Sequence, residues 1–107
     1  MPGGEAAIVD REKLAGYCLS PAHPRGKHKA RVFATIGFTV ENADDLRDAL
    51  LTAAATVDAL PGASDQFGDR YVLEFEVKGP DCAAILRSSW IVRRGESHPR
   101  LTSCFVK

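Results

Sequence analysis

Hydrophobic residues in the first part of the chain recur at a helical spacing. Leu14, Tyr17 and Cys18 fall at positions i, i+3 and i+4, which is one face of a helix. Asp10 stands just before this run and belongs to the residue types that cap helix N-termini. The pattern therefore predicts a first helix over about residues 11–19.

A second helix is expected to begin near Lys27. The segment before it, residues 21–26, holds two prolines and a glycine and should form a rigid loop. Gly37 follows the helical stretch and is expected to end it. Three residues form the apolar side of this helix: Ala30, Phe33 and Ala34.

The third helix has the most regular pattern and is predicted from Asn42 to about residue 60. Asn42 and Asp45 resemble a capping pair, and Pro61-Gly62 provides the stop. The apolar positions between these signals keep a helical period: Leu46, Leu50, Ala53, Val57 and Leu60.

The hydrophobic period changes to two beyond about residue 70, which indicates strands. Turn residues divide this region into three predicted strands, over about residues 71–77, 82–93 and 101–106. Sequential strands with short loops make an antiparallel meander. Helices followed by strands imply an α+β fold, with N-terminal helices packed on a C-terminal three- or four-stranded antiparallel meander.

Length and composition fit one soluble domain. The 107 residues carry no net charge, with 45% apolar and 26% charged residues, as is ordinary for a globular protein. We expect a flexible N-terminus at residues 1–8 and a single domain over 9–107, with helices over about 11–60 and a sheet over about 70–106. No run approaches the roughly 20 apolar residues of a membrane span. We therefore expect a cytoplasmic protein without a membrane partner.

The cysteines argue against a metal site. Cys18, Cys82 and Cys104 are odd in number, lack C-x-x-C spacing and lie among apolar residues. Free core thiols are the expected state, since free cysteine is among the most buried residue types. We expect neither a metal nor another cofactor.

A basic run over residues 23–31 stands out because the whole chain is neutral. It holds two histidines and no carboxylate, together with four cationic residues: Arg25, Lys27, Lys29 and Arg31. On a helix that starts at residue 27, a contiguous arc of about 100° is occupied by Lys27, His28, Arg31 and Thr35. Lys29 points elsewhere on a regular helix. An imidazole beside permanent cations suits holding a phosphodiester and moving a proton near it.

The predicted middle strand places Ser88 and Trp90 on one face. Two interpretations stay open. Trp90 is either the largest core side chain with Ser88 as a small polar filler, or a stacking plane for a base with Ser88 donating to phosphate.

The run from Leu19 to Phe33 resembles the signature of an uncharacterised bacterial domain family, L-x-P-x-H-P-x-G-x-H-K-A-R-x-F, with similarity over nearly the whole chain. A more distant resemblance joins Lys27-His28-Lys29-Ala30 with the Ser88-x-Trp90 pair. Together they are similar to the tRNA-cleaving domain of colicin D, and more broadly to the barnase, EndoU, colicin and RelE group of metal-free ribonuclease toxins. Colicin D carries Lys-x-Lys-His-Ala on a helix, so the order of Lys and His differs here.

The resemblance implies a small metal-independent endoribonuclease of the bacterial toxin type, acting on tRNA and neutralised by a cognate antitoxin or immunity protein. His28 would take the proton of a ribose 2′-hydroxyl, which attacks the phosphate and leaves a 2′,3′-cyclic phosphate. The implied phosphate-stabilising residues are Lys27, Lys29, Arg31 and Ser88. The implied substrate-binding residues are Trp90, Arg25, Arg93, Arg94 and Arg100.

Two other classes of function stay open at this point. The chain is alternatively a non-catalytic module that binds protein or nucleic acid through the same basic face. It is alternatively an antitoxin or immunity partner that uses the acidic helix over Glu41 to Asp48. The zero net charge counts against general nucleic-acid binding, for which a more basic domain is expected.

Overall fold

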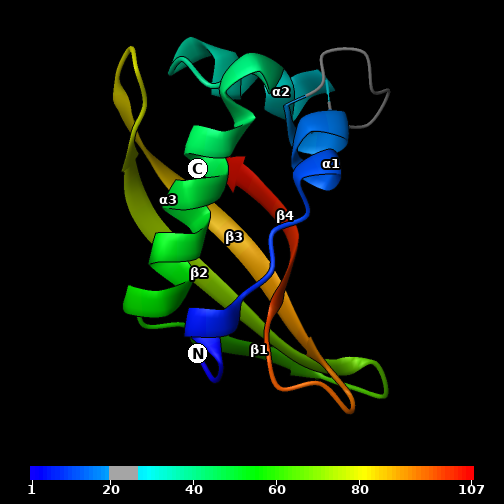
Figure 1. Ribbon diagram of the computed structural model, residues 1–107. Helices are drawn as coiled ribbons and strands as arrows, with labels where there is room; N and C mark the ends of the chain where they lie inside the picture. The colour runs from blue at the N-terminus through cyan, green and yellow to red at the C-terminus, as the bar shows by residue number, and fades with distance from the viewer. Residues whose placement is uncertain (20–26) are drawn as a thin grey trace.

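The computed structural model of the chain describes residues 1–19 and 27–107, without the side chains of Tyr17, Lys27 and His28. The loop predicted over residues 21–26 therefore lies outside the described residues, as do His23 and Arg25. In the described part, short helices and one long helix precede a sheet in the order β1-β2-β3-β4 (Figure 1). All neighbouring strands are antiparallel, which confirms the predicted α+β fold with four strands in the meander.

The elements have the following bounds. The helical elements are the 3-10 turn η1 (Gly4–Ala6), α1 (Arg11–Lys13), the π-helical turn η2 (Leu14–Cys18), α2 (Lys27–Thr35), the 3-10 turn η3 (Val40–Asn42) and α3 (Ala43–Thr56). The strands are β1 (Leu60–Ser64), β2 (Gly68–Lys78), β3 (Ala83–Arg93) and β4 (Arg100–Val106).

The first predicted helix forms, but with a wide turn at its end. Asp10 caps it, because its carboxylate accepts a hydrogen bond from the Glu12 amide at 2.9 Å. In η2 the Leu19 amide donates to the Leu14 carbonyl five residues earlier, at 3.0 Å. The wider turn lets Leu14, Cys18 and Leu19 all face the core, each at most 2% exposed.

The start of α3 differs from the sequence prediction. Asn42 does not pair with Asp45; it forms a capping box with Thr39, whose amide donates to the Asn42 side-chain oxygen at 2.8 Å. The Thr39 hydroxyl in turn accepts from the Glu41 amide. The cap therefore belongs to η3, which leads directly into α3.

The end of α3 also differs, because the helix stops at Thr56 rather than near residue 60. Leu60 and Pro61 instead pair with Val72 and Tyr71 of β2, as the start of the edge strand β1. Proline is tolerated there because an edge strand leaves one side unpaired. Strand pairing across the chain has overridden a helical pattern that continued through Leu60.

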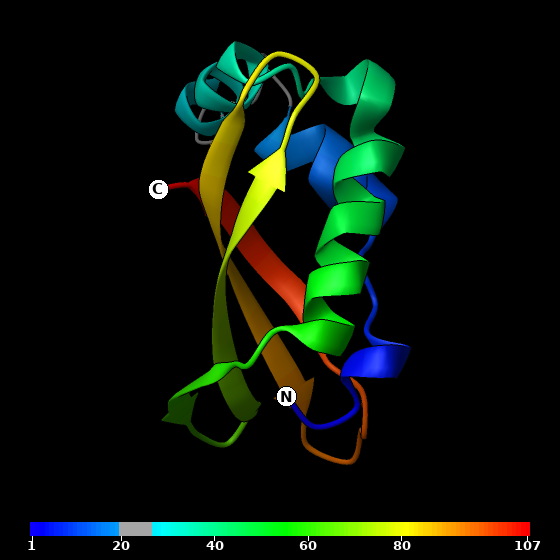
Figure 2. The same ribbon diagram turned by 90° about the vertical axis from the view of Figure 1, so that its left-hand side faces the viewer.

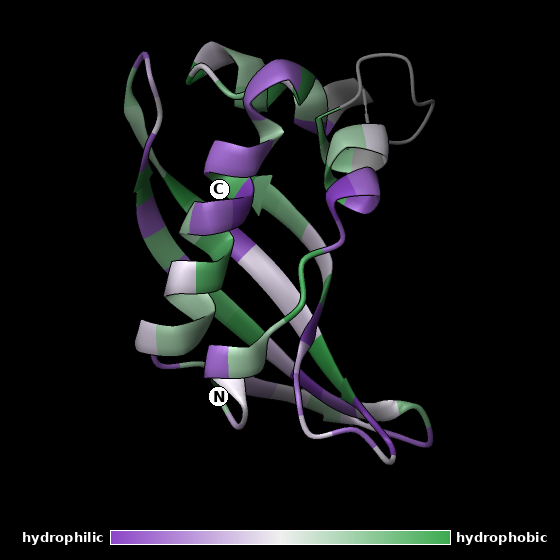
Figure 3. Ribbon diagram, in the orientation of Figure 1, coloured by the Kyte–Doolittle hydropathy of each residue, from purple (hydrophilic) through white to green (hydrophobic). Residues whose placement is uncertain are grey.

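The helices cover one face of the sheet. Figure 2 shows α3 and α1 on one side of the strands, the other side uncovered along most of its length, and α2 at the end of the sheet. Figure 3 shows hydrophobic stretches of the strands behind α3. The largest core residues of the sheet lie on this covered face: Leu73, Leu86, Trp90 and Leu101. We call the opposite side the open face.

The N-terminal residues 1–8, expected to be flexible, pack on the domain. The Ile8 amide donates to the Pro99 carbonyl at 2.9 Å, and Ile8 forms a parallel bridge with Arg100 of β4. Gly4 is buried against α3, where an added Cβ would lie 2.1 Å from the Ala54 carbonyl oxygen. Within residues 1–19 and 27–107, no helix is long and apolar enough to cross a membrane.

Candidate functional site

Polar and cationic side chains line the open face next to α2. Glu74, Arg87 and Phe105 stand directly opposite one another on β2, β3 and β4, so they form one row across the sheet. The next row away from α2 consists of Val72, Ser89 and Ser103. We call these the Arg87 row and the Ser89 row.

The Arg87 row gathers cations around one carboxylate. Lys107 donates a hydrogen bond from Nζ to Glu74 Oε2 at 2.9 Å, and Arg87 Nη1 lies 3.5 Å from Glu74 Oε1. The hydrogen bond from Lys107 and the charges of Lys107 and Arg87 hold the pKa of Glu74 below its usual range. These cations can therefore bind an anion, and in this structure the anion is the carboxylate of Glu74.

The start of α2 reaches this row through Lys29. Its ammonium lies 5.8 Å from the centroid of the Phe105 ring, within the range of a cation–π contact. Regular helix geometry predicts that Lys29 points away from the basic arc that Lys27, His28, Arg31 and Thr35 share. The structure brings Lys29 to the sheet, so the basic run does meet the strands.

The Ser89 row adds hydroxyl groups beside these cations. Ser89 and Ser103 are half-buried and face each other across β3 and β4. Thr102 is the extra residue of a bulge between the two strands, and its hydroxyl donates to the Ser89 carbonyl at 3.0 Å. Cations and hydroxyl donors therefore lie next to each other on one exposed surface.

Ser88 and Trp90, predicted as site residues, lie on the covered face instead. Both are 0% exposed. Trp90 Nε1 donates to Ser88 Oγ at 2.9 Å, and the Ser88 hydroxyl donates to the Leu73 carbonyl at 3.4 Å. Their polar atoms are satisfied within the core, so neither side chain meets a ligand on the open face. The structure therefore agrees with the interpretation in which Trp90 is a core side chain and Ser88 a small polar filler.

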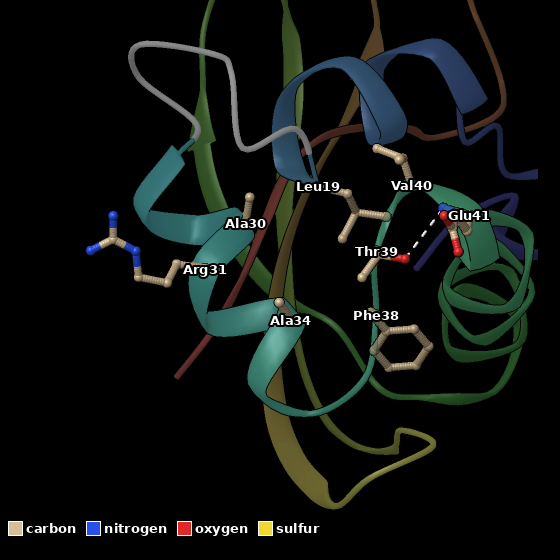
Figure 4. A pocket seen from close by; sticks show the side chains of 8 residues that line it. All are labelled: Leu19, Ala30, Arg31, Ala34, Phe38, Thr39, Val40 and Glu41. Atoms are coloured by element: carbon tan, nitrogen blue, oxygen red, sulfur yellow. Dashed lines mark hydrogen bonds between the residues drawn. The ribbon is translucent and has the colours of Figure 1, made fainter.

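Arg31 does not join Lys29 at the sheet. It is exposed, and Figure 4 shows its guanidinium extending away from the neighbouring pocket. Among the described residues it forms no hydrogen bond or ion pair. Lys27 and His28 begin α2, and their side chains lie outside the described part of the chain.

The arginines predicted to extend the site lie at the other end of the strands. Arg93 is six residues along β3 from Arg87, about 20 Å at the usual rise of a strand. Arg94 pairs with Asp69 at 3.2 Å, and Arg100 pairs with Glu96 at 2.8 Å. Arg93 also faces Glu96, at 4.0 Å. The structure thus does not bring these three arginines to α2.

Glu96 makes the stability of this fold sensitive to acid. The hydrogen bond from Arg100, followed by the charges of Arg100, His98 and Arg93, holds the pKa of Glu96 below its usual value. A carboxyl with a lowered folded-state pKa stabilises the fold above its unfolded pKa and loses this contribution as the pH falls. We expect the midpoint of thermal unfolding to fall between about pH 5 and pH 3, and to fall less in Glu96→Gln.

A matched variant isolates this effect. Glu41 is exposed and forms no ion pair among the residues the structure describes, so Glu41→Gln should keep the wild-type pH dependence. Equal slopes for the two variants, measured by circular dichroism, would contradict the stabilising role of the Glu96 cluster.

All three cysteines are free, but they differ in exposure. Cys18 and Cys104 are buried, whereas Cys82, expected in the core, is exposed beside the end of α2. A hydrogen bond with Cys104 lowers the pKa of Cys18 to about 7, with help from the charges of Lys29 and Lys13. The same bond and burial raise the pKa of Cys104. No group of three metal-ligating side chains occurs within residues 1–19 and 27–107.

A pocket of about 480 Å³ lies on another side of α2, between this helix and the segment that follows it (Figure 4). Its lining is mostly apolar: Leu19, Ala30, Arg31, Ala34, Phe38, Thr39, Val40 and Glu41. An apolar lining does not suit a phosphodiester, so the open face is the better candidate site.

The sequence matches the profile of a domain of unknown function, DUF6883, over residues 1–107. The chain belongs to the DUF6883 family. No curated protein matches the sequence.

The fold of this DUF6883 domain is similar to a chain of a contact-dependent growth inhibition toxin–immunity protein complex from Klebsiella pneumoniae 342. The TM-score is 0.73, with 19% sequence identity, and the match covers 94% of this chain and 99% of the other. At this identity the likeness shows a shared fold.

Arg87, Ser89 and Phe105 were not among the site residues predicted from the sequence of the DUF6883 domain. The strand alternation already placed Arg87 and Ser89 on the face opposite Ser88 and Trp90. Trp90 has the largest apolar surface in β3, and this feature identifies the covered face. The open face therefore follows from the alternation once Trp90 is assigned to the core.

Proposed function

We propose that this DUF6883 domain is a small metal-independent endoribonuclease of the bacterial toxin type, which cuts tRNA and is neutralised by a cognate antitoxin or immunity protein. The observation that carries the proposal is the contact of the basic start of α2 with the Arg87 row, through Lys29 and Phe105. The likeness to a chain of a toxin–immunity complex supports the same class. A tRNA substrate would place its action in the cytoplasm.

In this proposal His28 acts as the general base at the start of α2. It takes the proton of a ribose 2′-hydroxyl, and the 2′-oxygen attacks the adjacent phosphorus. The bond from phosphorus to the 5′-oxygen breaks, and this oxygen takes a proton from water. The products are a 2′,3′-cyclic phosphate and a 5′-hydroxyl end.

The open face supplies the electrostatic part of the reaction. Lys29 and Arg87 offset the negative charge that grows on the phosphoryl oxygens, with Lys27 as a further cation of the α2 start. Ser89 and Ser103 offer hydroxyl donors in place of Ser88, whose side chain lies in the core. Each group would act on the transferring phosphate.

We expect Arg87→Ala to slow tRNA cleavage about 100-fold, since removing one preorganised donor to a developing oxyanion has an effect of this size. Cleavage rates measured on purified tRNA, by gel, test this. Arg93→Ala is the matched control, because Arg93 lies on the same strand but far from α2. Equal rates for the two variants would argue against the Arg87 row as the site.

A second candidate function is an immunity protein, because the similar solved chain comes from a complex that contains both partners. The first turns of α3 carry exposed carboxylates that a basic toxin would recognise: Asp44, Asp45 and Asp48. A growth assay separates the two functions. A toxin expressed alone stops the growth of a bacterial host, and its cognate partner restores growth. Normal growth with the chain expressed alone, at a verified protein level, would favour the immunity role.

A further inference from the structure

Glu74 stands at the β2 end of the Arg87 row, where it is paired with two cations. Its two carboxylate oxygens face different cations, Lys107 at 2.9 Å and Arg87 at 3.5 Å. The side chains of all three residues are partly exposed: 32% for Glu74, 44% for Arg87 and 56% for Lys107. The cations are therefore within reach of a ligand from solvent.

The side chains near Glu74 are cationic and favour the binding of an anion. Among the described side chains, Arg87 and Lys107 are cations next to Glu74, and Lys29 lies over Phe105, the partner of Arg87 in β4. Two cations thus contact the carboxylate of Glu74, and a third lies at the other end of the same row. The next carboxylate on the same strand and face, Glu76, forms no ion pair within the described part of the chain.

We propose, on the basis of the ribonuclease function above, that Glu74 stands in for a phosphate of single-stranded RNA in the ligand-free protein, and that the RNA backbone displaces it from Arg87 and Lys107. A carboxylate and a phosphate use the same donors of a guanidinium, so one replaces the other without rebuilding the site. Exposed ion pairs are weak, which makes the exchange feasible. Glu74 thereby sets the affinity of the site for RNA.

The exchange predicts an unusual effect of substitution at Glu74. Glu74→Gln should bind an all-2′-O-methyl RNA octamer about threefold more tightly than the wild type, because one exposed ion pair no longer competes. The octamer lacks the 2′-hydroxyl and is not cut. Fluorescence anisotropy gives the dissociation constant.

Glu76→Gln is the matched control. It makes the same change in charge on the same strand and face, without releasing a cation. We expect its affinity to stay close to that of the wild type. Arg87→Ala should weaken binding of the octamer and lower the slope of log K against log salt concentration by about 0.7. Combined with Glu74→Gln, it should remove most of the increase in affinity that Glu74→Gln gives alone.

The proposal is overturned if Glu74→Gln binds no more tightly than Glu76→Gln, or if none of the proteins binds the octamer. Glu74→Ala provides a second test of the same direction, and circular dichroism shows whether each variant is folded. Cleavage of tRNA by the wild type tests the enzyme function separately. If the wild type cuts tRNA but the two Gln variants bind the octamer equally, only the role of Glu74 is rejected. If the affinities are as expected but no tRNA is cut, the enzyme function is rejected and the RNA-binding site at Glu74 stands.

Discussion

Replacing His28 with alanine should lower tRNA cleavage by about 1000-fold, the middle of the range for losing a general base. His28 carries the imidazole at the start of α2, and imidazole is the side chain that most often serves as a general base. The cleavage rate of purified protein, measured under single-turnover conditions, tests the chemical step directly. Binding of the uncut octamer should change little, because the base acts on the reacting oxygen.

His98 provides the matched control for His28. It lies in the turn between β3 and β4, 3.4 Å from Glu96 and at the far end of the strands from α2. His98→Ala should therefore keep the cleavage rate. Full cleavage by His28→Ala, or an equal loss in both variants, would remove His28 from the role of general base.

Replacing Trp90 with alanine should lower the free energy of unfolding by about 3–5 kcal/mol. Trp90 is the largest fully buried side chain of the domain, and its indole donates to Ser88 in the core. The substitution leaves a large cavity and removes the partner of the Ser88 hydroxyl. Urea unfolding followed by circular dichroism gives the change.

Leu60→Ala is the control for Trp90→Ala, because Leu60 is 65% exposed on the edge strand β1. Its effect should be within about 0.5 kcal/mol, as for most surface substitutions. If Trp90→Ala is as stable as the wild type and only RNA binding is lost, Trp90 contacts the ligand and the assignment to the core is wrong.

The elements of the fold followed from local patterns where local and long-range preferences agree. Asp10 caps the first helix as predicted, and alternation in β2 and β3 predicted both strands. The prediction failed at Leu60, where a helical position became part of β1. Pairing with Val72 decides that position, and a partner 12 residues away leaves no periodic signal.

The candidate site was predictable in part. The basic run led to α2 and Lys29, which contacts Phe105 of β4. The sequence did not show that Ser88 and Trp90 satisfy each other in the core, because strand alternation alone separates two faces and a tryptophan suits either a core position or a stacking plane. The positive charge of Arg93 and Arg94 predicted that they extend the site, but the length of β3 separates them from α2.

We propose that the open face next to α2 cuts RNA without a metal. Purified wild-type protein incubated with tRNA in excess EDTA, followed by analysis of the new ends, tests it most directly. We expect internal cuts that leave a 2′,3′-cyclic phosphate and a 5′-hydroxyl. These cuts should be lost in His28→Ala and strongly slowed in Arg87→Ala. Intact tRNA under these conditions, or cuts that leave a 3′-hydroxyl and a 5′-phosphate, would contradict it.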